Sequence, residues 1–295
     1  MSKYFDRRSF LLAAAAVPLA LARAAQAAPR HRTAEARDNL SQLEAVAGGR
    51  IGVFAIDTAN HATLRYRAGE PFPLCSTFKV VLVGAILRQS EHEDELLERR
   101  ISYTQSDLLS YSPITAKHLK LGMMVADLCA AAIRYSDNTT ANLLMKLLGG
   151  PASVTAFASS LHDRQFRLDR WEPDLNTCLP GDLRDTSTPE AMGLSLKQLA
   201  LGHVLKTEHR RLLLGWLRGS TTGAKRIRAG IPKDWQVGDK TGTGDYGTGN
   251  DIAVLWPPHR APIVAAIYTT QRVKEAKARN EIIAVAAQAI VRWSD

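Results

Sequence analysis

Hydrophobic and polar positions change their spacing several times along the chain, and each change marks an element. Residues 33–43 mix charged and apolar positions as an amphipathic helix does, and Gly48 follows this segment. Residues 50–57 then predict a strand, and residues 62–67 predict a strand that returns beside it after a turn. We therefore expect a helix followed by a β-hairpin.

The middle of the chain favours helices. From residue 78 to about residue 220, apolar residues recur mostly at helical spacing, most clearly at residues 123–133, 140–148, 154–161 and 196–204. One long interruption, residues 167–189, is rich in Asp, Pro and Gly. A loop of this length inside a compact domain is usually functional.

Strand character returns near the C-terminus, at residues 236–243, 252–256 and 262–269, and residues 276–291 predict a closing helix. This order predicts an α/β fold (an α+β sandwich): an antiparallel sheet of about five strands, flanked by N- and C-terminal helices. We expect one subdomain from residues 29–68 and 222–295, and an all-helical subdomain from residues 69–221. A cleft between two such parts is a favoured position for an active site.

Residues 1–28 predict an export signal of the twin-arginine type. Arg7 and Arg8 precede the apolar run 11–21, and a small-residue segment around Ala25 and Ala27 is typical of a cleavage site. The apolar run is about half the length of a membrane-spanning helix. We therefore expect a periplasmic protein with no membrane anchor after processing.

Composition excludes several other classes. The formal net charge of +9 would suit nucleic acid, but the chain has no basic run with interleaved aromatic residues and no zinc-finger spacing. It also has no C-x-x-C motif and no His/Cys cluster with metal-ligand spacing. We expect no nucleic-acid partner, no metal and no other cofactor.

Ser76 and Lys79 stand at the start of the apolar run 78–87. Three residues apart on a helix, their side chains share one face. A partly desolvated lysine can take the proton of a neighbouring serine because burial lowers its pKa. Taken alone, the pattern is more often a serine that caps a helix, with an exposed lysine one turn later.

Further motifs change this interpretation. Ser136-Asp137-Asn138 separates two helical segments, and Lys240-Thr241-Gly242 lies on a predicted strand. Together with Ser76-x-x-Lys79 they resemble the three defining motifs of the serine β-lactamase and penicillin-binding protein superfamily. Glu172-Pro173-Asp174-Leu175-Asn176 resembles the Ω-loop motif of class A β-lactamases, which we place at about residues 167–185. The four motifs occur in family order.

The resemblance implies a role for each matching residue. Ser76 would attack a strained lactam carbonyl and form an acyl-enzyme. The backbone N–H groups of Ser76 and Thr243 would form the oxyanion hole. Ser136, flanked by Lys79 and Lys240, would pass a proton to the departing lactam nitrogen.

The loop motif implies the second half of the reaction. Glu172 and Asn176 would hold a water molecule, and Glu172 would deprotonate it to hydrolyse the acyl-enzyme. Without the resemblance Glu172 would be interpreted as a surface carboxylate. Whether Glu172 or Lys79 is the base for acylation stays open. Arg170 and Asp185 are the expected pair at the neck of the loop.

The residues expected to bind substrate are Asn138, Asn176, Thr241, Thr243, Arg226 and Tyr111. Asn138 would bind the side-chain amide of the substrate, or would cap the next helix. Arg226, rather than Arg228, would clamp the substrate carboxylate, although both arginines could instead be solvated. Tyr111 would form an aromatic wall at the mouth of the cleft, or would simply pack.

Three cysteines remain, Cys75, Cys129 and Cys178, and we expect all three to be free and largely buried. Some carbapenem-hydrolysing relatives bridge the position of Cys75 to a cysteine just after Lys-Thr-Gly-x, where this chain has Gly244. The common helix partner of Cys129 is replaced here by Val83. The resemblance therefore does not support carbapenem hydrolysis.

The leading hypothesis is a monomeric class A β-lactamase that hydrolyses penicillins and cephalosporins and gives antibiotic resistance. A penicillin-binding peptidase of the same fold would acylate but deacylate slowly, and that class lacks the loop with Glu172 and Asn176. A non-catalytic peptidoglycan-binding protein would bury the same polar groups without use, at a cost of several kcal/mol.

Overall fold

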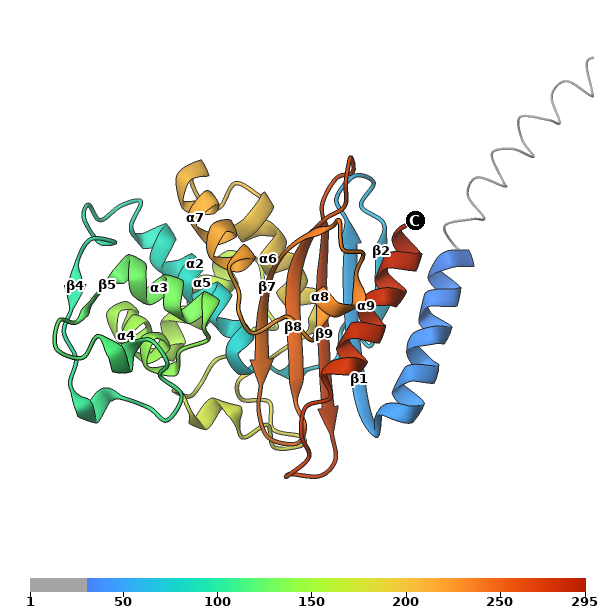
Figure 1. Cartoon of the computed structure of the whole chain (residues 1–295), viewed down its shortest axis with the longest axis horizontal. Coiled ribbons are helices and arrows are strands. Elements are labelled where there is room, and N and C mark those ends of the chain that lie inside the picture. The colour runs from blue at the N-terminus through green and yellow to red at the C-terminus, as the bar shows by residue number, and fades with distance from the viewer. Residues whose placement is uncertain (1–30) are drawn as a thin grey trace, which may run out of the picture.

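The computed structural model describes residues 31–295, so the predicted export signal over residues 1–28 lies outside the described residues. Within this range lies a five-stranded antiparallel sheet with the strand order β2-β1-β9-β8-β7 (Figure 1). The strands are β1 (Gly49–Asp57), β2 (Thr63–Tyr66), β7 (Gln236–Thr243), β8 (Gly249–Trp256) and β9 (Ile263–Gln271). The predicted fold class is confirmed, since both ends of the chain build one sheet.

The two terminal helices cover one face of the sheet (Figure 1). They are the helix over residues 31–47 and α9 (Asn280–Ser294). Ile51 and Val53 of β1 belong to the hydrophobic cluster on this face, whereas Phe54 belongs to the cluster on the other. Because both faces of the sheet are covered, almost every position of the central strands is buried.

Helix α6 (Pro189–Leu201) packs on the opposite face, against β1, β8 and β9. Beyond it lies α2 (Lys79–Gln89), which is surrounded by further helices. These helices are α3 (Val125–Arg134), α4 (Asn138–Leu148), α5 (Pro151–Ser160) and α7 (Thr207–Arg218).

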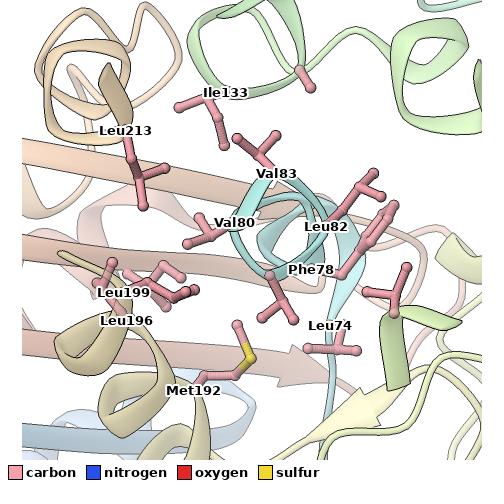
Figure 2. Packing of buried hydrophobic residues seen from close by; sticks show 14 of the residues in the cluster. Leu74, Phe78, Val80, Leu82, Val83, Ile133, Met192, Leu196, Leu199 and Leu213 are labelled. Carbon is pink, nitrogen blue, oxygen red and sulfur yellow. The ribbon is translucent and has the colours of Figure 1, made fainter. Parts of the chain in front are cut away.

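Figure 2 shows α2 at the centre of this packing, with Val80 and Val83 among Ile133, Leu199 and Leu213 of the neighbouring helices. The helix is buried from Lys79 to Leu87. A helix buried on every side needs an apolar sequence all round, which explains the unbroken hydrophobic run. Each large side chain buried in this way contributes roughly 1.5–3 kcal/mol.

The helical prediction is wrong between residues 90 and 124. This segment contains turns, two short 3-10 helices, η2 (Gln105–Asp107) and η3 (Thr115–Lys117), and the paired strands β4 (Arg100–Ile101) and β5 (Met123–Met124). Gly122 has φ +65°, which a helix does not allow. The buried carboxylate of Asp137 accepts hydrogen bonds from the N–H groups of Ile114 and Thr115, and so satisfies backbone groups that have no helical partner.

Several boundaries also differ from prediction. α6 begins at Pro189, not at residue 196, because Thr188 Oγ1 accepts a hydrogen bond from the N–H of Ala191 and Pro189 suits the first turn. α9 begins at Asn280 rather than at residue 276, and β8 begins at Gly249 rather than at residue 252.

The remaining short elements position the site. They are β3 (Phe72–Pro73), η1 (Cys75–Phe78), η4 (Asp174–Asn176), β6 (Thr186–Ser187) and α8 (Ile227–Gly230). β3 pairs with β6, which holds the end of the predicted Ω-loop beside the start of η1. No helix in the described range is long and apolar enough to span a membrane.

Candidate active site

Ser76 lies in the 3-10 turn η1, immediately before α2 begins at Lys79. Thr77 Oγ1 donates a hydrogen bond to the carbonyl oxygen of Leu74 at 2.6 Å and hydrogen-bonds with the Tyr268 hydroxyl at 2.9 Å. Because Tyr268 belongs to β9, this hydrogen bond attaches the turn to the sheet. Ser76 itself is about 8% exposed and faces the cleft described below.

The ammonium nitrogen of Lys79 lies at the centre of the site. It is 2.9 Å from Ser76 Oγ, 2.9 Å from the carbonyl oxygen of Ser136, 2.7 Å from Asn138 Oδ1 and 3.0 Å from Glu172 Oε1. An ammonium group has only three N–H donors for these four oxygens. In the hydrogen bond with Ser76, the Lys79 ammonium donates to Oγ, whereas a neutral Lys79 amine can accept the proton of the hydroxyl.

Both buried lysines of the site are shifted toward the neutral form. Burial lowers the pKa of Lys79, and the charge of Glu172 opposes this effect. The pKa of Lys240 lies well below its ordinary value, first because of burial and next because of the charge of Lys79. Lys240 Nζ donates to Ser136 Oγ at 2.9 Å. Ser136 therefore contacts both lysines.

The carboxylate of Glu172 closes the other side of the site. Ser76 Oγ donates to Glu172 Oε1 at 3.4 Å, and Asn176 Nδ2 donates to Glu172 Oε2. Asn176 Oδ1 is buried and has no hydrogen-bond partner among the described residues. An acceptor of this kind beside a carboxylate suits a bound water molecule.

Asn142 on α4 holds the backbone of Glu172 at both ends. Its Nδ2 donates to the carbonyl oxygen of Glu172 at 2.9 Å, and its Oδ1 accepts from the Glu172 N–H at 3.0 Å. The role of Asn142 was not predicted from the sequence. Its signal was its position on α4, one turn after Asn138, which places it on the face of the helix that carries a predicted site residue.

The predicted pair at the neck of the loop is present. Arg170 Nε lies 2.5 Å from Asp185 Oδ2, while Asp185 Oδ1 accepts from the N–H groups of Asp169 and Arg170 at 2.8 Å and 2.9 Å. Asp185 is about 1% exposed. Three hydrogen bonds to one buried carboxylate thus close the loop that carries Glu172.

A cleft of about 400 Å³ opens above these groups. Its lining residues are Ser76, Tyr111, Ser136, Asn138, Asn176, Thr222, Arg226, Thr241, Gly242 and Thr243. Tyr111 is half exposed at its edge, and it also lines a second hollow beside the cleft. Thr222 was not predicted; its hydroxyl hydrogen-bonds with that of Thr241 at 2.6 Å, and no motif surrounds it.

Asn138 does not cap α4. The cap is Asp137, whose carboxylate accepts from the N–H of Thr140 at 3.0 Å, while Asn138 is the first residue of the helix. The side chain of Asn138 is instead held toward the cleft by Lys79, which donates to its Oδ1. Its amide nitrogen is left to face the cleft that the residue lines.

Arg226 is buried rather than solvated, with about 6% exposure. Its Nη1 donates to the carbonyl oxygens of Gly242 and Asn250, its Nε donates to Asn280 Oδ1, and its Nη2 donates to Thr243 Oγ1 at 2.7 Å. One N–H of Nη2 has no partner in the described part of the chain. Arg226 is therefore not arranged for a bidentate clamp, but it fixes Thr243 and can offer a single donor.

Arg228 lies away from the cleft. It pairs with the buried carboxylate of Asp239 on β7, and burial raises the pKa of that carboxyl while Arg228 lowers it. The alternative that both arginines are solvated is wrong, since each has a buried partner. The preference for Arg226 over Arg228 agrees with the lining of the cleft.

The backbone of β7 lies directly against the turn that carries Ser76. A Cβ atom on Gly242 would lie 3.2 Å from the Ser76 nitrogen and 3.0 Å from the carbonyl oxygen of Leu74. A side chain here would crowd both backbone atoms, so glycine suits this close approach. Thr243 follows at once, so the two backbone N–H groups predicted for an oxyanion hole come from neighbouring segments.

Cys75, Cys129 and Cys178 are all free and buried, as predicted. No group of three His, Cys, Asp or Glu residues within residues 31–295 is arranged to hold a metal ion.

The chain matches the Beta-lactamase enzyme family over residues 34–294. It is 51% identical over 291 residues to β-lactamase OXY-1 from Klebsiella oxytoca, which covers 98% of this chain and 99% of that protein. It is 50% identical over 284 residues to β-lactamase Toho-1 from Escherichia coli, covering 96% and 97%. It is 53% identical over 249 residues to the carbapenem-hydrolyzing β-lactamase KPC from Klebsiella oxytoca, covering 84% and 85%.

A solved structure agrees with these relatives. The β-lactamase from Desulfarculus baarsii DSM 2075 superposes with a TM-score of 0.88 at 56% sequence identity, covering 89% of this chain and 98% of that chain. Both the sheet and the helices around α2 are therefore shared with a known β-lactamase. On the family match, the identities and this likeness, the chain belongs to the class A serine β-lactamases, which are hydrolases.

Proposed function

We propose that this protein hydrolyses the amide bond of β-lactam antibiotics, penicillins and cephalosporins, through an acyl-enzyme on Ser76. The observation that carries the proposal is the position of Ser76 Oγ, 2.9 Å from Lys79 Nζ and 3.4 Å from Glu172 Oε1. Ser76 thus lies close to two groups that can accept a proton. Lys79 would do so in acylation and Glu172 in deacylation. The substrate class, β-lactams, is supported by the relatives, which are β-lactamases.

In the acylation half, Lys79 takes the proton of Ser76 as Oγ attacks the lactam carbonyl. The support is the short contact and the lowered pKa of Lys79, which favours a neutral amine. The developing oxyanion is received by the N–H groups of Ser76 and Thr243. Ser136, hydrogen-bonded to Lys240, then donates its proton to the lactam nitrogen.

The substrate is held by polar groups that surround the reacting bond. Thr241 and Thr243 offer hydroxyls to its carboxylate, and Arg226 adds one N–H while it orients Thr243. Asn138 offers its amide nitrogen to the substrate side chain, and Tyr111 forms the wall at the edge of the cleft.

In the deacylation half, Glu172 deprotonates a water molecule that then attacks the ester on Ser76. The support is that Asn176 Oδ1 is buried without a hydrogen-bond partner among the described residues, while Asn176 Nδ2 donates to the carboxylate of Glu172. The proposed setting is the periplasm, after removal of the export signal, where hydrolysis would give antibiotic resistance. The proposed form is a monomer.

The test is turnover of benzylpenicillin by the mature protein beside Glu172→Gln, with mass spectrometry of each sample. We expect sustained turnover by the parent and an accumulated acyl adduct on Ser76 in the variant, with turnover lower by about 10²–10⁴. The matched control is Asp174→Asn, an exposed carboxylate two residues away in the same loop, which should turn over as the parent does. One stoichiometric adduct on the parent without turnover would instead indicate a penicillin-binding protein and would refute the role of Glu172.

A further inference from the structure

Two of the three cysteines face each other across the site. Cys75 lies in η1 directly before Ser76, and Cys178 lies in the Ω-loop, two residues after Asn176. Their Sγ atoms are 3.5 Å apart although 103 positions separate them in the sequence. The contact joins the turn that carries the nucleophile to the loop that carries Glu172.

Gly244 leaves room for the two sulfur atoms, and both cysteines have an unusual backbone conformation. Gly244 has no side chain, and a Cβ atom there would lie 2.5 Å from Cys178 Sγ and 2.9 Å from Cys75 Sγ. Both cysteines have left-handed backbones, with φ +43° and φ +48°, which residues other than glycine rarely adopt. The two sulfur atoms thus meet in a space that Gly244 leaves open.

We propose that Cys75 and Cys178 form a redox-dependent disulfide that ties the Ω-loop to the turn of Ser76. The proposal does not depend on the proposed hydrolysis, since it concerns a covalent bond beside the reacting groups. A disulfide needs an Sγ–Sγ distance of about 2.05 Å. In the proposal, rotation of the two side chains toward each other closes the gap from the observed 3.5 Å.

An oxidant can reach this pair from outside the substrate cleft. Cys178 lines a separate cavity of about 660 Å³, which shares no lining residue with the cleft around Ser76. Arg50, Arg67 and Arg272 line this cavity together with Glu44 and Asp182, so the basic side chains of its lining outnumber the acidic ones by one. The oxidant of the proposal is a small anionic disulfide, for which oxidised glutathione is the probe.

The exchange proceeds in two steps that balance. The Cys178 thiolate attacks one sulfur of the oxidant, forms a mixed disulfide and releases one glutathione thiolate. Cys75 then gives up its proton and attacks Cys178 Sγ, which releases the second glutathione. Two thiols are oxidised, one disulfide is reduced to two thiols, and the two protons go to the two glutathione thiolates.

The hydrogen-bonding of the pair fits this order of attack. The hydrogen bond from Cys75 lowers the pKa of Cys178 despite its burial, whereas the hydrogen bond with Cys178, together with burial, raises the pKa of Cys75. The thiolate is the attacking form of cysteine. Cys178, which lines the open cavity, is thus also the better first nucleophile.

The test counts free thiols in the full mature chain. Samples treated with oxidised glutathione or with a reductant are unfolded, labelled with a maleimide and weighed by mass spectrometry. We expect three labels after reduction and one after oxidation, the label on Cys129, together with a peptide that links Cys75 to Cys178. Three labels in both samples, a stable glutathione adduct on Cys178, or a link through Cys129 would each overturn the proposal.

Thermal unfolding provides a second readout with matched variants. Because the bridge would close a loop of about 100 residues, oxidation should raise the Tm of the parent by roughly 5 °C or more. Cys129→Ser should keep this difference, since Cys129 is buried in a different part of the helical core. Cys178→Ser should abolish it. An equal rise of Tm in Cys178→Ser would refute the bridge, and the linked peptide decides the matter in the unchanged chain if that variant fails to fold.

Discussion

Ser76 is surrounded by two lysines and a glutamate whose charges act on one another. Burial lowers the pKa of both Lys79 and Lys240, and the charge of Glu172 raises that of Lys79 while the charge of Lys79 lowers that of Lys240. Each substitution among these groups must therefore change the protonation of its neighbours as well as its own chemistry.

The first prediction concerns the pH dependence of acylation in Glu172→Gln. Acylation by neutral Lys79 falls as the pH drops through the pKa of Lys79. Glu172 raises that pKa, so its neutralisation lowers it. The acidic limb of the acylation rate should thus move to lower pH in the variant, as measured by single-turnover mixing with a chromogenic cephalosporin. A limb that does not move would refute the charge coupling between Glu172 and Lys79, and acylation that collapses at every pH would identify Glu172 as the acylation base.

The second prediction concerns stability and Lys240. Its pKa in the folded protein is lower than in the unfolded chain, so between these two values the unfolded chain binds more protons and stability rises with pH. Below the folded pKa the full cost of the buried charge remains. Lys240→Met should therefore have a higher free energy of unfolding than the parent at neutral pH, by about 0.5–2 kcal/mol. The difference should shrink as the pH approaches the ordinary lysine pKa.

Urea unfolding at neutral and alkaline pH measures this effect. The variant should at the same time lose activity, because Ser136 loses its hydrogen-bond donor. A Lys240→Met protein that is less stable than its parent at neutral pH would show that the hydrogen bonds of Lys240 outweigh the cost of its burial.

At the scale of elements, the Ω-loop depends on contacts at its neck. The third prediction is that Asp185→Ala destabilises the protein by about 3–5 kcal/mol, because it leaves Arg170 and two N–H groups without their buried acceptor. Thermal unfolding checks the stability. Deacylation should fall much more than acylation, since Glu172 is on this loop and Ser76 is not.

The control is Arg167→Ala in the same loop. Arg167 pairs with Asp169, and its side chain is about half exposed, so its loss should cost less than about 1 kcal/mol. Equal losses in the two variants would contradict the view that the buried carboxylate holds the loop.

How far the sequence predicts each element depends on where its hydrogen bonds go. β7 was predicted over residues 236–243 and is observed there, where it pairs with β8, the next strand along the chain, so that its ladder hydrogen bonds go to a near neighbour in sequence. The segment between residues 90 and 124 could not be predicted in full, because Asp137, more than twenty residues further along the chain, accepts from the N–H groups of Ile114 and Thr115. For the same reason, the roles of Asn142 and Thr222 and the hydrogen bonds of Arg226 could not be predicted, since they depend on tertiary neighbours.

For the whole molecule, α6 is the connection between the sheet and the helices around α2. Gly193 on α6 lies against Phe54 of β1, where an added Cβ atom would come within 2.5 Å of the ring. On α2, a Cβ atom on Gly84 would lie 2.9 Å from the methyl groups of Leu199 of α6. Two glycines thus allow α6 to approach both of its neighbours closely.

The last prediction compares two Gly→Ala changes in helices. Alanine favours a helix over glycine by about 1 kcal/mol, so Gly215→Ala on α7, with no atom within 4 Å of the new Cβ, should stabilise the protein by roughly 0.5–1 kcal/mol. Gly193→Ala gains the same propensity but overpacks the contact with Phe54, at a cost of about 1–3 kcal/mol. We therefore expect opposite shifts of the urea midpoint. Because α6 packs on β1, β8 and β9 of the sheet and on α2, the loss in Gly193→Ala should appear as one earlier transition, and equal gains in the two variants would show that α6 is not packed this tightly.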